Sequence, residues 1–226
     1  MRDGVKSRAV VLALALGVAV VPEAMAGWGT VAGAGASIPW GQNGPQKLVT
    51  TGFGATWGAL YRLESRLEVV GRVVYTTHTR DDDGVLEATG LRSRPVNVLQ
   101  VSGGDLSLRE ISADVRYFPS QGTTSFLTHP YLLAAAGVTA HRYGRVEVSY
   151  QYAGHTWLEG LEKEEGVNAS LAVGAGLRFD FSPRMGALVE GRYQEMMRGG
   201  ENLRSAPIRL ELYVLFGAVR RTSTPE

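Results

Sequence analysis

The chain has 226 residues, of which 44% are hydrophobic, and its 23 basic and 22 acidic residues leave a formal net charge of +1. A near-neutral chain of this length suits one domain, and it lacks the broad basic surface that binding to nucleic acid requires. It contains no cysteine, which excludes disulfides, thiolate metal sites and a cysteine nucleophile.

The first 26 residues have the features of a secretory signal peptide. Three basic residues precede the apolar segment 9–21 (AVVLALALGVAVV), which is short for a membrane-spanning helix. Ala24 and Ala26 then form an A-x-A site. We predict cleavage after Ala26, which leaves residues 27–226 as the barrel domain described below; a retained membrane anchor is the alternative.

Eight later segments are predicted strands. Most alternate apolar residues with polar or small ones, which indicates an extended chain with two unlike faces. In chain order the segments are 28–38, 50–63, 67–77, 107–118, 131–142, 167–181, 185–193 and 208–219. Segment 131–142 (YLLAAAGVTAHR) has no clear polar face, so its facing stays open. Within the loops, 96–101 and 146–152 also alternate and are predicted to prolong the wall beyond a membrane.

The hairpin 167–193 carries the pattern most clearly. The apolar residues of its first strand share one face, whereas glycine, alanine and charged residues share the other; a Ser182-Pro183-Arg184 turn follows. Such strands are about as long as a tilted membrane-spanning strand needs to be. We therefore predict that the apolar face meets lipid and that the charged face lines a narrow barrel.

The connections between predicted strands alternate in length. Long loops at 39–49, 78–106, 143–166 and 195–206 are expected outside the cell, and short turns are expected in the periplasm. Aromatic residues beside the short turns are predicted to form a girdle at the periplasmic boundary. They are Tyr117, Phe118, Tyr131, Phe179, Phe181 and Phe216.

Charged residues on the inward faces are predicted to fill the lumen. The six basic and six acidic members are Arg62, Glu68, Arg72, Glu110, Asp114, Arg116, Arg178, Asp180, Glu190, Arg192, Arg209 and Glu211. A barrel of about eight strands has room only for its own side chains, and opposite charges at low dielectric should pair. We expect a plug of ion pairs and no open pore. Gly29, Gly33 and Gly35 share the inward face and leave space for these side chains.

Segment 174–193 (GAGLRFDFSPRMGALVEGRY) resembles the sixth-to-seventh-strand hairpin of small OmpA/OmpX-like outer-membrane β-barrel proteins, the porin-like barrel domain family. His129-Pro130-Tyr131, which leads into a small-residue strand, is similar to that family's Pro-Tyr strand opening. The resemblance implies an all-β, closed antiparallel up-and-down transmembrane barrel in the bacterial outer membrane. Phe216 followed by GAVRRTSTPE departs from the aromatic ending that is frequent in the family.

Candidate sites in the loops are sparse. His155 lies between Ser149 and Glu159, yet nothing in the sequence brings the three together as a catalytic set, and the His-x-Ser-Asn motif of lipid A deacylases is absent. The acidic run 81–84 (DDDG) lacks EF-hand spacing and is interpreted as a solvated loop. We therefore predict no catalytic, cofactor-binding or metal-binding residue, no cofactor, and no enzymatic activity.

Three functions remain open from the sequence. The first is a structural or surface-interaction protein, a monomer whose loops 78–106 and 143–166 contact lipopolysaccharide, surfaces or proteins. The second is a narrow channel for small solutes, and the third is a lipid-modifying enzyme. The alternative fold is a soluble periplasmic lipocalin-like barrel.

Overall fold

The computed structural model describes residues 27–40, 47–64, 66–119, 128–198 and 202–216. The predicted signal peptide at 1–26 and the predicted end of the last strand at 217–219 lie outside these ranges. Among the described residues, no helix is both long enough and apolar enough to cross a membrane.

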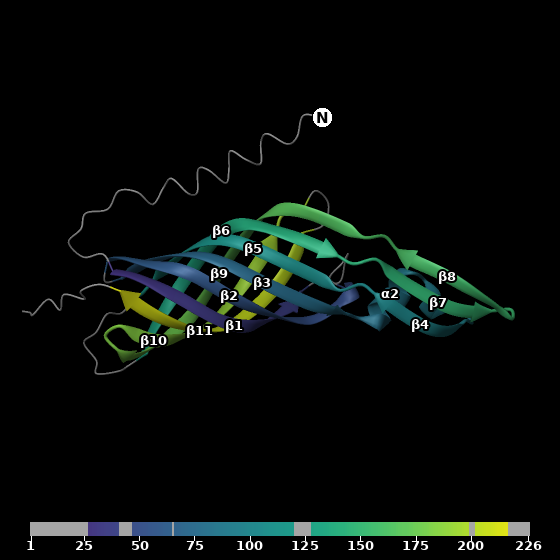
Figure 1. Cartoon of the computed structure of the whole chain (residues 1–226), viewed down its shortest axis with the longest axis horizontal. Helices are drawn as coiled ribbons and strands as arrows, with labels where there is room; N and C mark the ends of the chain where they lie inside the picture. Colours follow the sequence, from purple (N-terminus) through teal and green to yellow (C-terminus); the bar gives the residue numbers. More distant parts are fainter. Residues whose placement is uncertain (1–26, 41–46, 65, 120–127, 199–201, 217–226) are drawn as a thin grey trace, which may run out of the picture.

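Eight strands close into an antiparallel barrel, as predicted (Figure 1). They are β1 (Gly27–Pro39), β2 (Val49–Glu64), β3 (Leu67–Arg80), β5 (Leu106–Tyr117), β6 (Thr128–Tyr143), β9 (Glu164–Ser182), β10 (Met185–Met196) and β11 (Leu203–Phe216). Around the barrel the order is β1-β11-β10-β9-β6-β5-β3-β2, so every barrel strand pairs with the barrel strands before and after it in the chain, and the first pairs with the last. Trp28 lies opposite Phe216 at the end of that closing seam. Closure leaves no edge strand in the barrel, so no row of backbone N–H and C=O groups is left unpaired.

Glycine allows the seam between β1 and β11 to close. A Cβ atom at Gly33 would lie 2.1 Å from the carbonyl oxygen of Leu210, and one at Gly35 would lie 2.3 Å from that of Ile208. These distances are far below any van der Waals contact, so only glycine fits at this register. The sequence predicts that glycines on this face leave space for the side chains of the lumen. The structure shows that Gly33 and Gly35 also leave space for the backbone of β11.

The two longest loops build a second structure at one end of the barrel, which we call the fin. It comprises strands β4 (Asn97–Gly103), β7 (Val146–Tyr152) and β8 (His155–Leu161), in the order β4-β7-β8. Each continues a barrel strand in the chain: β4 leads into β5, β7 follows β6, and β8 leads into β9. The prediction of extended structure at 96–101 and 146–152 is therefore confirmed, but these strands pair in a separate sheet and do not prolong the barrel wall. Figure 1 shows the fin projecting from the barrel.

A short helix, α2 (Asp82–Ala88), and the 3₁₀ turn η2 (Leu91–Ser93) pack at the base of the fin. The sequence predicts neither, because the acidic run 81–84 has the composition of a solvated loop. Asp81 instead caps the helix, and its carboxylate accepts hydrogen bonds from the backbone N–H groups of Asp83 and Gly84. Val85 and Leu91 are buried in a cluster at the loop-side end of the barrel that also contains Tyr143 and Val148.

The outward faces of the barrel strands are apolar and exposed. Ile111 is 62% exposed, and Leu210 and Leu212 are each 59% exposed. Tyr117, Phe181 and Phe216 face outward at the turn-side end, where a girdle was predicted. For Phe118 and Tyr131 the prediction was wrong, because both side chains are buried in the interior. Those two rings lie 5.3 Å apart between their centres and belong to a buried cluster.

Candidate functional site

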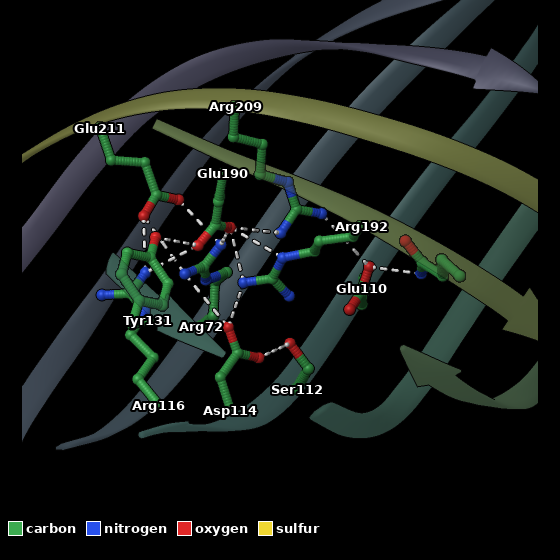
Figure 2. A network of polar contacts seen from close by, with 11 residues as sticks. Arg72, Glu110, Ser112, Asp114, Arg116, Tyr131, Glu190, Arg192, Arg209 and Glu211 are labelled. Carbon is green, nitrogen blue, oxygen red and sulfur yellow. Dashed lines mark hydrogen bonds and ion pairs between the residues drawn. The ribbon is translucent and has the colours of Figure 1, made fainter. Parts of the chain in front are cut away.

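The inward faces of the barrel strands hold a network of charged side chains (Figure 2). Arg72, from β3, lies at its centre. Its Nη1 atom is 2.7 Å from Glu190 Oε1 and 2.8 Å from Glu211 Oε1, and its Nη2 atom is 3.1 Å from Asp114 Oδ2. These partners come from three other strands, β10, β11 and β5. One guanidinium group therefore links four strands across the lumen.

Glu190 is the matching acidic centre. Besides Arg72, its carboxylate accepts hydrogen bonds from Arg116 at 3.1 Å, from Arg192 Nε at 2.7 Å and from the Tyr131 hydroxyl at 3.0 Å. Arg192 also contacts Asp114. Each of these side chains is at least nine-tenths buried. Four donors on one buried carboxylate hold it as an anion, since its charge is compensated on several sides.

A second group of ion pairs lies toward the turn-side end of the lumen. Glu68 contacts Arg62 at 2.6 Å and Arg178 at 2.9 Å, and Arg178 Nε is 3.0 Å from Asp180. The guanidinium of Arg178 lies 4.4 Å above the centre of the Phe118 ring. The Phe118 ring therefore packs against the guanidinium of an ion-paired arginine, which explains why the Phe118 side chain faces inward.

The loop-side part of the lumen is less tightly filled. Arg209 approaches Glu110 and Glu190 only to 3.9 Å each, and Gln194 donates a hydrogen bond to Glu110 at 2.8 Å. Beside them is a cavity of about 30 Å³ whose lining includes Thr56, Gly35 and Gly54. That volume holds roughly two water molecules. A second cavity of about 30 Å³ lies beside His78, Leu106 and Gln194, so among the described residues the loop-side part of the lumen holds at least two pockets of water size.

All twelve charged residues predicted for the lumen face it or its turn-side end, and each contacts at least one group of opposite sign. The predicted facing of these residues is therefore confirmed. Six positive and six negative charges cancel, and the central side chains of Arg72 and Arg116 are almost wholly buried. The arrangement is suited to holding a closed interior together.

Sequence reasoning missed one member of this network. Tyr131 faces inward with Leu133 and Ala135, and the Arg116 guanidinium lies 5.3 Å from the centre of its ring. The segment 131–142 alternates between small and apolar residues on both faces, so no pattern in it marks the inward side. The signal that finds Tyr131 is the pairing of β6 with β5 and β9, which fixes which residues face the lumen.

The loop residues considered as a catalytic set do not come together. His155 lies opposite Tyr152 at the tip of the fin, whereas Ser149 lies three residue pairs further down β7. The Ser149 hydroxyl bonds the carbonyl of Gln100, and Glu159 pairs with Arg94 at 3.7 Å. At about 3.4 Å per pair, His155 and Ser149 are roughly 10 Å apart along the strands, too far for proton transfer.

The base of the fin is closely packed over the loop-side end of the barrel. Tyr143 is 4% exposed, and its ring packs as a large apolar surface in the cluster. Among the described residues there is no group of three or more His, Cys, Asp or Glu side chains that could hold a metal ion.

Comparison with protein-family models gives no match, and neither does comparison with curated proteins. The chain is similar to several solved structures. Neisserial surface protein A has 19% identity and a TM-score of 0.47, over 84% of this chain and 96% of that one. The Yersinia pestis attachment invasion locus protein, Ail, has 14% identity and a TM-score of 0.48, over 85% and 99%. A major outer membrane protein from Thermus thermophilus has 15% identity and a TM-score of 0.49, over 84% and 99%.

The predicted fold, a closed antiparallel barrel of eight strands, is confirmed. The closed ring of eight antiparallel strands follows from the strand pairing of this chain itself. Similarity at these identities concerns architecture, and what the loops of the other proteins bind remains a property of those proteins.

Proposed function

We propose that this protein is a β-barrel of the bacterial outer membrane that anchors the fin for contacts at the cell surface. The observation that carries the proposal is the reversed polarity of the barrel. Its exposed wall consists of apolar side chains such as Ile111 and Leu210, whereas its buried interior consists of ion pairs such as Arg72–Glu190. Hydrocarbon around the wall stabilises this arrangement, because only the apolar side chains then meet lipid.

Water around the same wall would oppose the arrangement. A soluble protein rarely exposes a continuous apolar patch of more than a few hundred Å². Outward residues on all eight strands contribute to this wall; its large exposed members include Phe53, Trp57, Val73, Ile111, Val115, Leu132, Val173, Val189, Leu210 and Leu212. The soluble lipocalin-like alternative requires the opposite polarity, with an apolar interior around a ligand cavity. The observed distribution therefore supports insertion in a membrane.

The fin supplies the surface for interactions. Near its tip Tyr152 and Trp157 are 51% and 52% exposed, and Leu158 is 77% exposed. Tyrosine and tryptophan offer large contact area at low cost in conformational entropy, which makes them frequent anchors in interfaces. Their distance from the barrel wall along the fin favours contact with a partner outside the membrane over contact with lipid tails.

The filled lumen favours an anchor over a channel. Arg72, Arg116, Glu190 and Glu211 occupy its centre with less than 2% of their surface exposed. An ion that crosses would have to break several buried ion pairs, each of which is costly to leave without a partner. For the same reason we do not expect the protein to transport solutes through its lumen.

Fractionation and planar-bilayer recording test the proposal together. We expect the protein in the outer-membrane fraction, with heat-modifiable mobility on a gel, labelling of the fin on intact cells, and no large stable conductance. Recovery as a soluble periplasmic protein would overturn the membrane assignment, and a large stable conductance would replace the anchor with a channel. Mass spectrometry of lipid A from cells with and without the protein tests the enzyme alternative, for which we expect identical spectra.

A further inference from the structure

Outward-facing charge on the barrel strands has a restricted position. Apart from Glu64 beside a turn, the charged residues on the outer face of the described barrel strands lie at the loop-side end. They are Arg109, Arg142, Glu165, Glu195 and Arg204. The apolar wall begins below them. In a membrane-inserted barrel this is the depth at which lipid headgroups replace hydrocarbon.

Arg109 differs from the rest of that set. Glu195 and Arg204 pair at 3.1 Å, and Arg142 pairs with Glu165 at 3.0 Å. Within the part of the chain that the structure describes, Arg109 forms no ion pair and no side-chain hydrogen bond. Its guanidinium carbon lies 6.0 Å from the centre of the Tyr75 ring, a weak contact at an exposed position. Arg109 therefore presents its donors outward.

The strand register brings Arg109 and Arg142 to the same groove. On β5 and β6, Ser107 lies opposite Arg142, and Arg109 lies opposite Ala140. The two arginines are thus diagonal neighbours, roughly 7–8 Å apart at the backbone, within reach of their long side chains. They line an open groove of about 430 Å³ together with Ser107, Ala140 and Val167. The methyl group of Ala140 leaves its centre empty.

The chemistry of the groove matches a phosphate. Two guanidinium groups and the Ser107 hydroxyl offer donors above, and outward apolar residues of the wall, including Ile111, lie below. Arginine forks bind phosphate oxygens bidentately, whereas an acyl chain fits the apolar wall. An amphipathic ligand with phosphate above hydrocarbon satisfies both halves.

Glu165 lies at the upper edge of the groove and does not cancel its charge. Its Oε1 atom is shared between the Lys163 ammonium at 2.7 Å and Arg142 Nε at 3.0 Å. The groove lining itself holds two positive groups, Arg109 and Arg142, and one negative group, Glu165. The groove keeps a net positive charge that attracts an anion.

We propose that this groove binds a phosphorylated membrane lipid of the leaflet on the loop side, and that Arg109 and Arg142 hold its phosphate. The inference rests on the proposed function, because it needs the barrel wall to lie in a membrane. It adds a defined lipid site to a protein whose fin contacts other partners.

Native mass spectrometry of the detergent-solubilised protein tests the site. The probes are diphosphorylated lipid A and the same lipid without its phosphates. We expect the wild-type chain to retain the phosphorylated lipid preferentially, and the double variant Arg109→Gln/Arg142→Gln to weaken its retention roughly tenfold, as loss of charge-assisted hydrogen bonds predicts. Arg145→Gln is the matched control, because Arg145 is 72% exposed beside the fin, away from the groove, and pairs with Glu147. It should retain the lipid like the wild-type chain.

The alternatives give different results. The site is overturned if the wild-type chain retains both lipids equally. It is also overturned if the double variant retains the phosphorylated lipid as well as the wild-type chain does. Displacement of the lipid by millimolar inorganic phosphate overturns the lipid as the source of the phosphate. Heat-modifiable mobility of both chains in vesicles is recorded in parallel. Failure of the wild-type chain to insert overturns the proposed function, whereas insertion without lipid preference overturns only the groove.

Discussion

Arg72 and Glu190 are 118 residues apart in the sequence, and their side chains meet at 2.7 Å inside the barrel. They lie on β3 and β10, which are four strands apart in either direction around the ring. The pair therefore spans the full width of the lumen, and it exists only when the ring is closed. Arg72 also contacts Asp114 on the adjacent strand β5, and Glu190 contacts Arg192 on its own strand, so closure completes the pairing of these two charges.

Replacement of Glu190 by glutamine should destabilise the barrel strongly. The change leaves Arg72, Arg116 and Arg192 with one fewer buried anion, and loss of one partner from a buried ion pair costs about 3–5 kcal/mol. Urea unfolding in lipid vesicles measures the difference in the free energy of unfolding. Glu87→Gln is the control, since Glu87 pairs with Lys47 on the surface at 3.4 Å and should contribute at most about 1 kcal/mol. Equal effects of the two variants would contradict a central role for the lumen network.

Substitution of Gly33 by alanine should weaken closure of the barrel. The added Cβ would lie 2.1 Å from the Leu210 carbonyl oxygen, so β1 and β11 must separate, at a cost of roughly 1–3 kcal/mol or more. Gly71→Ala is the matched control on another barrel strand, because a Cβ there meets no atom within 4 Å. The fraction of protein with heat-modifiable mobility should fall for the first variant and stay unchanged for the second. A normal folded fraction for Gly33→Ala would show that the seam tolerates a wider spacing.

An arginine introduced on the outer wall of the barrel should lower the free energy of unfolding, whereas an arginine introduced on the fin should not. Leu210 on β11 and Leu158 on β8 are both exposed leucines, 59% and 77%, but only Leu210 lies on the barrel wall. Arginine facing the hydrocarbon near its midplane costs about 2–4 kcal/mol, and arginine facing water costs little. Unfolding in vesicles should therefore show a loss for Leu210→Arg and almost none for Leu158→Arg. Similar values for both would place the wall in water.

A change at the base of the fin should disorder the fin while the barrel stays folded. Gly103 has a φ of 73°, and a Cβ there would lie 2.0 Å from the Arg145 carbonyl oxygen. Gly103→Ala thus adds backbone strain and a steric clash at the junction of β4 and β5. Limited proteolysis should cut the fin of this variant faster, whereas heat-modifiable mobility should persist. Gly90→Ala is the control, since Gly90 has a φ of 69° with no atom within 4 Å, so it carries the strain alone. Loss of the folded barrel in Gly103→Ala would mean that fin and barrel fold as one unit.

The alternation of residues was enough to predict the barrel and the charged members of its lumen. A charged side chain within an apolar alternation reveals the inward face directly, as Arg178 and Asp180 do on β9 and Glu190 does on β10. Hydrophobic burial imposes period two on each strand, so one such residue fixes the facing of its neighbours. This reasoning needs no knowledge of which strands pair.

Aromatic residues escaped the same reasoning. Phe118 and Tyr131 suit a membrane boundary and a buried interior equally well, because both places accept large apolar rings. The Phe118 ring packs against Arg178 of β9, and the Tyr131 ring packs against Arg116 of β5. Their inward position therefore depends on partners from other strands, which the neighbouring sequence does not reveal. The helix α2 was missed for a related reason: its acidic first turn looks solvated until Asp81 is recognised as its cap and Val85 as its buried contact.

The balanced charges of the lumen also constrain the route by which the chain enters a bilayer. Each arginine of the network would cost a few kcal/mol if its strand crossed the hydrocarbon alone. The counter-charges of Arg116, on β5, are supplied by β10 and β11, the last two strands of the barrel. Strand-by-strand insertion in chain order would therefore expose naked charge to lipid until its end. For a barrel inserted in the outer membrane as proposed, concerted entry of a nearly assembled ring would avoid that barrier, and the ion pairs would then select the route of assembly as well as fill the finished lumen.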